Sequence, residues 1–151
     1  MPDPGLVFER VIALPRAIVW DAVTDPDLIW GWLAEVRLFP DRPRAFELLW
    51  PGPSFSPPTR GSVTRLQPPA LVEVDTDNRG CIRIALRSIE GGPRGSSTIV
   101  RIVVTPDIEP AFSGRVREEW ERNLDRLDGL LRGHPIDRAS LRAADPSMRT
   151  K

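Results

Sequence analysis

The sequence predicts a single α+β domain, in which a curved antiparallel sheet of about six to seven strands wraps around a long C-terminal helix. Three observations predict it. Apolar and polar residues alternate between residues 35 and 105, as in strands with one buried face. Apolar residues recur at helical spacing over residues 109–132. Two short helical segments lie near the N-terminus, so the C-terminal helix is the only element long enough to cover the sheet.

The N-terminal part predicts a strand followed by two short helices. Residues 6–13, "LVFERVIA", are apolar and β-branched, which favours a strand. Pro15 is placed to begin a helix, because its missing N–H costs nothing in the first turn. The Thr-Asp-Pro sequence ends that helix before Pro26. Asp25 is then a cap for a second helix over residues 26–33, which begins at Pro26.

The middle of the chain predicts strands with one apolar and one polar face. Residues 44–50, "RAFELLW", and 81–89, "CIRIALRSI", alternate in this way, as do residues 97–105. The turn between the last two strands is "EGGPRGSS". Glu47 and Glu73 fall opposite the apolar side chains, so we expect both on the solvated face. The side chains expected on the buried face are Phe46, Leu48, Trp50, Ile82, Ile84, Leu86, Val100, Ile102 and Val104.

The C-terminal helix is predicted from a stripe of apolar residues that step by three or four positions. Gly133 is a natural stop for this helix, and Pro135 follows it. Residues 1–133 therefore form the predicted domain. Residues 134–151 are polar and lack a period, so we expect a mobile tail. The members of the stripe are Val116, Trp120, Leu124, Leu127 and Leu131.

Composition and charge exclude several classes of protein. The 21 basic and 21 acidic residues cancel, so no net field attracts nucleic acid. The chain has no apolar run long enough to span a membrane, and its N-terminus lacks the pattern of a signal peptide. A cytoplasmic protein without bound nucleic acid is therefore expected.

The chain offers few residues for catalysis or metal binding. Its single cysteine, Cys81, sits in an apolar strand and is expected to be a packed thiol. Its single histidine, His134, follows the long helix and has no partner for a Ser-His-Asp triad. No His/Cys cluster is present for zinc. We therefore predict no catalytic residue, no metal and no cofactor.

Several stretches at the two ends and in the middle of the chain form a recognisable pattern. The opening has Leu14-Pro15, then "VWDAVTDP" (19–26), Leu28 and Trp32, and the ending has Trp120, Leu124, Leu127 and Leu131. Between them lie Gly61 with Val63, "PPALVEVD" (68–75) and Ser97-Thr98. Together these stretches resemble the homologues of the activator of heat-shock protein 90 ATPase, within the SRPBCC or START-like superfamily. Glu119 stands where the family usually has glycine, and the further N-terminal domain of the eukaryotic co-chaperone has no counterpart here. The resemblance covers about residues 6–132. It implies the helix-grip fold of the birch pollen allergen.

A curved sheet against one helix often encloses a void, and concave apolar pockets are the usual sites for small ligands. We expect the void to lie between the sheet and the C-terminal helix and to bind a small hydrophobic molecule or lipid. Asn123, at the edge of the helical stripe, is the expected polar group. In this superfamily the second short helix borders the pocket mouth. The resemblance therefore implies that Trp32, near the end of that helix, lies at the mouth. The predicted ligand-binding residues are Trp32, Phe46, Leu48, Trp50, Ile84, Trp120, Asn123 and Leu127.

Two alternatives remain open at this stage. One is an enzyme of the cyclase or dehydratase type, which would need a single acid inside the void. The other is an interaction or co-chaperone-like module, or a homodimer, with an exposed apolar patch near Trp30 and Phe55.

Overall fold

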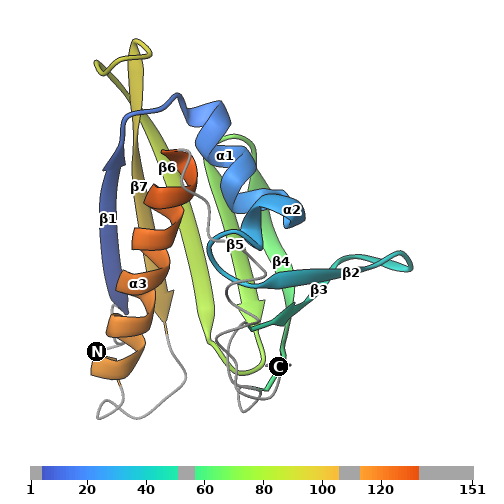
Figure 1. Ribbon diagram of the computed structural model, residues 1–151. Coiled ribbons are helices and arrows are strands. Elements are labelled where there is room, and N and C mark those ends of the chain that lie inside the picture. Colours follow the sequence, from blue (N-terminus) through green and yellow to red (C-terminus); the bar gives the residue numbers. More distant parts are fainter. Residues whose placement is uncertain (1–4, 51–56, 106–112, 133–151) are drawn as a thin grey trace, which may run out of the picture.

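The computed structural model describes residues 5–50, 57–105 and 113–132 (Figure 1). A seven-stranded, fully antiparallel sheet and a C-terminal helix are present, as the sequence predicts. Two short helices, α1 and α2, follow the first strand. The elements in chain order are β1 (Leu6–Ile12), α1 (Arg16–Thr24), α2 (Pro26–Ile29), β2 (Glu35–Phe39), β3 (Arg42–Leu49), β4 (Thr59–Gln67), β5 (Leu71–Thr76), β6 (Cys81–Glu90), β7 (Ser96–Thr105) and α3 (Ser113–Leu131).

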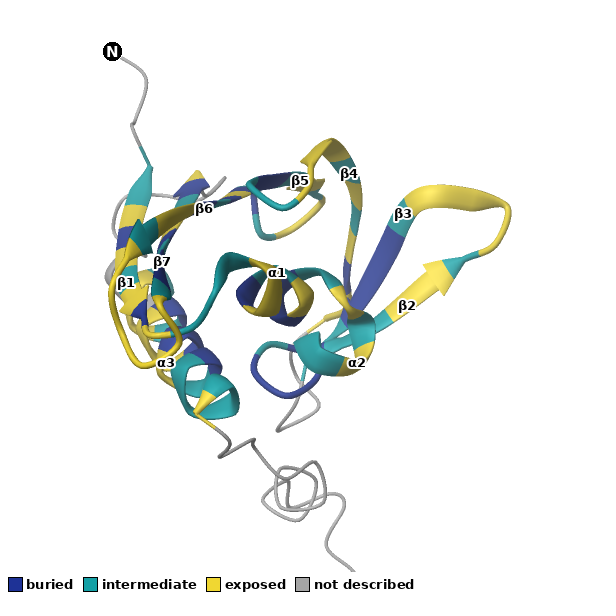
Figure 2. Cartoon of the chain, turned by 90° about the horizontal axis from the view of Figure 1, so that it is seen from above, coloured by how far each residue is buried: buried dark blue, intermediate teal, exposed yellow. Residues whose placement is uncertain are grey.

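The sheet runs in the order β1-β7-β6-β5-β4-β3-β2, so the first strand pairs with the last. Phe8 of β1 lies opposite Ile102 of β7. Seen from above, the strands curve around α1, and α3 lies beside β1 and β7 (Figure 2). The expectation that the sheet wraps around the C-terminal helix is therefore wrong in one respect. The element inside the curve is α1, and α3 covers one end of the sheet.

The α1–α2 joint forms largely as the sequence predicts. Helix α1 ends at Thr24, and the Asp25 side chain accepts a hydrogen bond of 3.0 Å from the Asp27 backbone N–H. Helix α2 stops at Ile29, four residues before the predicted end. Hydrogen-bonded turns continue beyond it, with the Leu33 N–H donating to the Ile29 carbonyl oxygen at 2.8 Å. Gly31 packs closely against α3, because a Cβ there would lie 3.0 Å from Leu130 Cδ1.

The structure also corrects the expectation for Trp30. The sequence predicts an exposed aromatic side chain at this position. The Trp30 backbone is still helical, with φ −60° and ψ −25°, and the residue is only 8% exposed. No exposed aromatic patch forms around Trp30. Phe55, the other half of the expected patch, lies outside the described residues.

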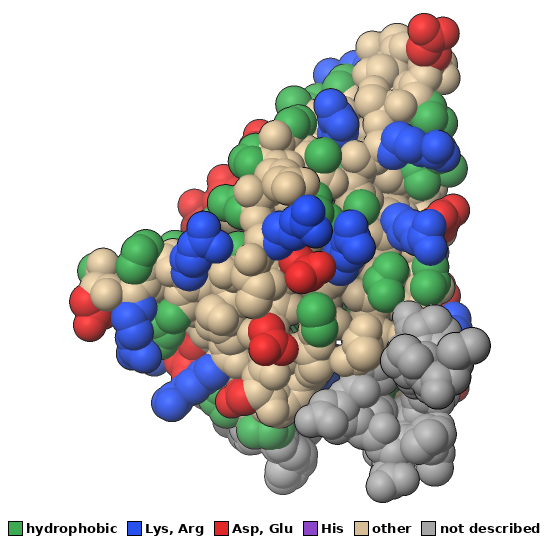
Figure 3. All heavy atoms as spheres, turned by 180° about the vertical axis from the view of Figure 1, so that it is seen from behind, with side chains coloured by type: hydrophobic (Ala, Val, Ile, Leu, Met, Phe, Trp, Pro, Cys, Tyr) green, Lys and Arg blue, Asp and Glu red, His purple; other side chains and the backbone are tan. Residues whose placement is uncertain are grey.

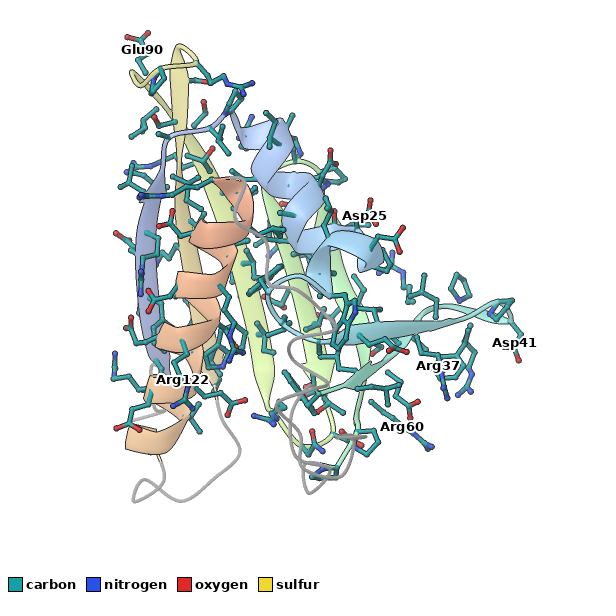
Figure 4. All side chains as sticks on the ribbon, in the orientation of Figure 1. Asp25, Arg37, Asp41, Arg60, Glu90 and Arg122 are labelled. Atoms are coloured by element: carbon teal, nitrogen blue, oxygen red, sulfur yellow. The ribbon has the colours of Figure 1, made fainter. Side chains whose placement is uncertain are left out.

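The outer face of the sheet is charged, but Glu47 on that face is buried. Arginine side chains are interspersed with acidic and hydrophobic ones there (Figure 3). Glu47 points away from Phe46 and Leu48, as alternation predicts, yet it is only 7% exposed. Arg37 of β2 and Arg60 of β4, both labelled in Figure 4, come from the strands on either side of β3. Their guanidinium nitrogens lie 3.4 and 3.2 Å from the Glu47 carboxylate oxygens. The expectation of a solvated Glu47 is therefore wrong. Glu73 is half-buried and lies 4.0 Å from Arg83.

Replacing Glu47 by glutamine is expected to lower the free energy of unfolding by about 1 kcal/mol. Two charge-assisted hydrogen bonds are weakened. Both arginine side chains are largely exposed, so water replaces much of what they lose. Urea unfolding measures the change, with Glu90→Gln at the exposed β6–β7 turn as the control (Figure 4). Equal midpoints for the two variants would show that the pairs around Glu47 contribute nothing.

None of the helices in the described part of the chain is both long enough and apolar enough to cross a membrane. The described residues also contain no group of three or more His, Cys, Asp or Glu side chains arranged to hold a metal ion.

Candidate functional site: an apolar pocket beneath α1 and α2

A pocket of about 280 Å³ lies between the α1–α2 segment and the inner face of β3–β6. Helices α1 and α2 form one wall with Val23, Thr24, Pro26 and Ile29. Trp32 and Leu33, in the turn after α2, extend that wall. The sheet forms the opposite wall. Its lining side chains include Val36, Phe46, Leu48, Val63, Val72, Val74, Ile82 and Ile84.

The alternation of the strands places these apolar side chains in the pocket. Phe46 and Leu48 share one face of β3, and Ile82 and Ile84 share one face of β6. Phe46 lies opposite Gly61 of β4, and a Cβ on that glycine would come within 2.7 Å of the ring. The absence of a side chain at residue 61 therefore lets the Phe46 ring rest on the neighbouring strand.

Trp32 is the most firmly held part of the pocket wall. Its side chain is 2% exposed, and its indole N–H donates a 2.8 Å hydrogen bond to the Ala22 carbonyl oxygen of α1. This hydrogen bond fixes the orientation of the ring and gives the buried indole N–H the partner that it needs. Trp32 both lines the pocket and joins the turn after α2 to α1.

The described lining holds very few polar groups. The Thr24 hydroxyl donates to the Trp20 carbonyl oxygen at 2.7 Å, so its hydrogen is already engaged. Arg44, at the exposed end of the pocket, is the only charged side chain in the described lining. No carboxylate, cysteine or histidine belongs to that lining. These walls can bury an apolar molecule, but they supply no general acid.

Five of the eight predicted ligand-binding side chains line this pocket, and three do not. The expected location also changes. Only Trp120 represents α3 in the described lining, so the pocket lies mainly under α1 and α2. The five lining residues are Trp32, Phe46, Leu48, Ile84 and Trp120. Trp50, Asn123 and Leu127 lie elsewhere.

Trp50 belongs to a polar cluster that ties α3 to the end of the sheet. Its indole N–H donates to the Thr59 hydroxyl at 2.9 Å, and Thr59 in turn donates to Asn78 at 2.6 Å. The Arg79 guanidinium stacks 4.2 Å from the centre of a Trp50 ring. Arg79 also forms a 2.6 Å ion pair with Glu119 of α3, next to Trp120. Trp50 therefore helps to position the helix that carries Trp120.

Asn123 and Leu127 point into the protein but not into the pocket. Leu127 is fully buried in the hydrophobic core, together with Leu124. Asn123 is buried as well, and its side-chain oxygen accepts a 3.4 Å hydrogen bond from Arg126. The helical stripe therefore correctly predicts that Leu127 is buried. Leu127 packs against other core side chains, however, and does not line the pocket.

Sequence reasoning placed Trp32, after the second short helix, at the pocket, but it missed Arg44 and the other side chains of the α1–α2 wall. The signal for Arg44 is present in the sequence, because it precedes Phe46 by two positions and so shares its strand face. The other side chains of the α1–α2 wall carry no comparable signal. Thr24, Pro26 and Ile29 reach the pocket only because the joint at Asp25 turns the chain toward the sheet.

The Cys81 thiol, at the start of β6, lies outside the pocket and is half-buried. Burial raises its pKa, and the charges of Glu73 and Asp75 raise the pKa further, against a smaller opposite effect of Arg83. A raised pKa means little thiolate at neutral pH. This agrees with the expectation of an unreactive packed thiol.

Alkylation of Cys81 by iodoacetamide is expected to be slower in the folded protein than in urea at pH 8. The midpoint of its rate–pH profile should lie above the ordinary thiol value, because the thiolate is disfavoured. Glu73→Gln removes a nearby negative charge and should move the midpoint to lower pH, whereas Asp128→Asn on α3 should leave it unchanged. A wild-type midpoint below the ordinary value would contradict the buried, acid-flanked environment.

No protein-family model and no curated protein matches this sequence. Many solved structures do match its fold. The Aha1 dimer from Colwellia psychrerythraea has a TM-score of 0.68 at 16% identity, over 85% of this chain and 96% of that one. CalU16 from Micromonospora echinospora has a TM-score of 0.57 at 23% identity, over 83% and 73%. DynU16, from the dynemicin biosynthetic locus, has a TM-score of 0.63 at 16% identity over 89% of this chain. The alignment spans 49% of DynU16.

These likenesses define the class of fold. The chain shares its fold with these solved structures, consistent with the helix-grip architecture that the sequence resemblance implied. At identities below 25% they show the fold alone, because one fold hosts many functions.

Proposed function

We propose that the protein binds a small hydrophobic molecule in the pocket beneath α1 and α2. The observation that carries this proposal is the pocket's lining, which is aliphatic and aromatic apart from Thr24 and Arg44 in its described part. A volume of about 280 Å³ is close to the lower end of the range for small-molecule sites. Concave apolar walls with few polar groups are typical of such sites.

The expected driving force is the burial of the ligand's apolar surface. A ligand that buries about 200 Å² gains about 5 kcal/mol at 25 cal/mol per Å². A gain of about 5 kcal/mol corresponds to a Kd of about 0.2 mM, and association costs offset most of it, so burial alone supports affinities no tighter than about millimolar. A tighter complex needs a polar or charged contact in addition.

The two alternatives receive less support. A cyclase or dehydratase with a single acid needs a carboxylate in the pocket, and the described lining has none. The interaction module was expected to expose an apolar patch at Trp30, which is buried. Binding of a small molecule is therefore the function that the described residues favour.

Native mass spectrometry of freshly purified protein tests the proposal. We expect an added mass that dissociates as a small molecule, and the same spectra report any homodimer. Titration with decan-1-ol, followed by tryptophan fluorescence, provides a second readout because Trp32 and Trp120 line the pocket.

The matched variants are Val74→Phe and Val103→Phe. Val74 lines the pocket, whereas Val103 of β7 is half-buried and outside it. Val74→Phe should fill part of the pocket and abolish binding, and Val103→Phe should leave it intact. Equal effects of the two variants, or no binding by the wild-type protein in either assay, would overturn the proposed function.

A further inference from the structure

We propose that the ligand is an acidic amphiphile, whose carboxylate pairs with Arg44 at the pocket mouth while its apolar chain fills the pocket. This inference rests on the proposed function and names the chemical class of its ligand. Three features carry it: the position of Arg44, the state of its guanidinium donors and the volume of the pocket.

Arg44 lies at the outer end of the pocket. It shares a face of β3 with Phe46, so its side chain begins on the same side as the pocket wall. Leu38 and Leu66 also line the pocket, and they are 58% and 50% exposed. These exposed lining residues mark the mouth between the β2–β3 hairpin and β4. At this place the Arg44 guanidinium can contact one end of a bound molecule, while the interior of the pocket stays apolar.

The Arg44 guanidinium is held in place and still has free donors. Its Nη1 donates to the Val63 carbonyl oxygen of β4 at 3.3 Å. Among the described residues, no carboxylate lies within ion-pair distance of Arg44, whereas Arg37 and Arg60 nearby both pair with Glu47. Arginine has five N–H donors in a planar fork that matches a carboxylate. One anchored donor leaves the others available to an anion at the mouth.

The charges around the mouth favour an anion over a cation. No acidic side chain belongs to the described lining. Arg42, two residues before Arg44, stacks on Phe39 at 4.9 Å and adds a second positive charge on the same hairpin. A cationic head group would meet two arginines and no lining carboxylate. A neutral head group would leave the free Arg44 donors to water.

The volume sets the length of the apolar part. A pocket of about 280 Å³ is small for a small-molecule site, so it favours a single apolar chain of medium length over a larger ligand. The two acyl chains of a membrane phospholipid exceed this volume several times. The geometry therefore points to a free monocarboxylate of medium length, and decanoate is the natural probe.

The experiment compares decanoate with decan-1-ol, which has the same chain and no charge. Isothermal titration at pH 7.5 and low salt measures both on the wild type and on Arg44→Gln, with Arg42→Gln as the matched control. Arg42 shares the hairpin but does not line the pocket. We expect the wild type to bind decanoate about tenfold more tightly than decan-1-ol, as for one partly exposed charge-assisted contact.

Arg44→Gln should remove that preference without changing the affinity for decan-1-ol, and Arg42→Gln should retain the preference. Val74→Phe should block both ligands. Equal affinity of the wild type for the acid and the alcohol would overturn the inference and leave the proposed function standing. Equal losses in the Arg42 and Arg44 variants would also overturn it, since they would indicate a diffuse positive surface. Failure of both ligands to bind would overturn the inference and the proposed function together.

A vesicle assay separates the free acid from a membrane head group. Co-sedimentation with phosphatidylserine vesicles should be absent or weak. Strong co-sedimentation that survives Val74→Phe would assign Arg44 to a lipid surface and overturn the free-acid proposal.

Discussion

Replacing Trp32 by alanine is expected to lower the free energy of unfolding by about 3–5 kcal/mol, the range for a large aromatic side chain removed from a core. The side chain is 2% exposed, and it bridges the turn after α2 and the backbone of α1. Removing it enlarges the existing pocket and leaves the Ala22 carbonyl oxygen without its indole donor. Both effects act on the same wall, so little relaxation can offset them.

Urea unfolding followed by circular dichroism measures this loss, with Trp32→Phe as the graded comparison. Phenylalanine keeps most of the apolar volume and loses the indole hydrogen bond, so we expect a loss of about 1–2 kcal/mol. If Trp32→Ala cost less than about 1 kcal/mol, Trp32 would not hold the α1–α2 wall and the description of the pocket would be wrong.

Replacing Leu127 by alanine is expected to lower the free energy of unfolding by about 2–5 kcal/mol while leaving ligand affinity unchanged. Leu127 is fully buried in the core and does not line the pocket. Ile84→Ala, at a buried position that does line the pocket, should reduce both stability and affinity. The pair therefore separates packing from binding within residues that sequence reasoning had grouped together.

Thermal or urea unfolding gives the stability of each variant, and titration with decan-1-ol on folded protein gives the affinity. Leu66→Ala, at the half-exposed mouth, is the control for stability and should cost well under 1 kcal/mol. A loss of affinity in Leu127→Ala as large as that in Ile84→Ala would place the site against α3 rather than under α1 and α2.

The periodicity of the sequence predicts which face of each element is buried. Phe46, Leu48 and Ile84 lie on the inner face because strand side chains alternate, and Leu124 and Leu127 are buried because helical neighbours recur every three to four residues. The α1–α2 joint is also predictable, since Asp25 and Pro26 determine it through local capping. Side-chain alternation, helical spacing and capping all depend on residues that are close together in the sequence, so the sequence alone predicts them.

The position of the pocket could not be read from periodicity, because it depends on which buried faces meet. Gly31 lies so close to Leu130 of α3 that a side chain would not fit without a shift, and Trp30 beside it is buried. The strand register places Arg37 and Arg60 beside Glu47 and so buries a carboxylate. Alternation along the strand predicts that Trp50 faces the pocket, but β3 ends at Leu49, and the Trp50 indole N–H instead donates to the Thr59 hydroxyl. Each case depends on a contact between residues of different elements.

The placement of α3 explains why the pocket remains open. The helix packs beside β1 and brings Trp120 to 6.3 Å from Phe8, measured between ring centres. The Arg79–Glu119 ion pair fixes the turn of α3 that carries Trp120. The inner faces of β3–β6 are then left to α1 and α2, which are too short to fill the whole concavity with side chains.

The most direct test of the central claim is a methyl-resolved NMR titration with decanoate, which suits a chain of 16.9 kDa. We expect contacts between the ligand chain and the methyl groups of Leu48, Ile82 and Ile84, with none to Val100 or Leu127. Contacts centred on Leu127, or the absence of ligand contacts to Leu48, Ile82 and Ile84, would contradict a site beneath α1 and α2.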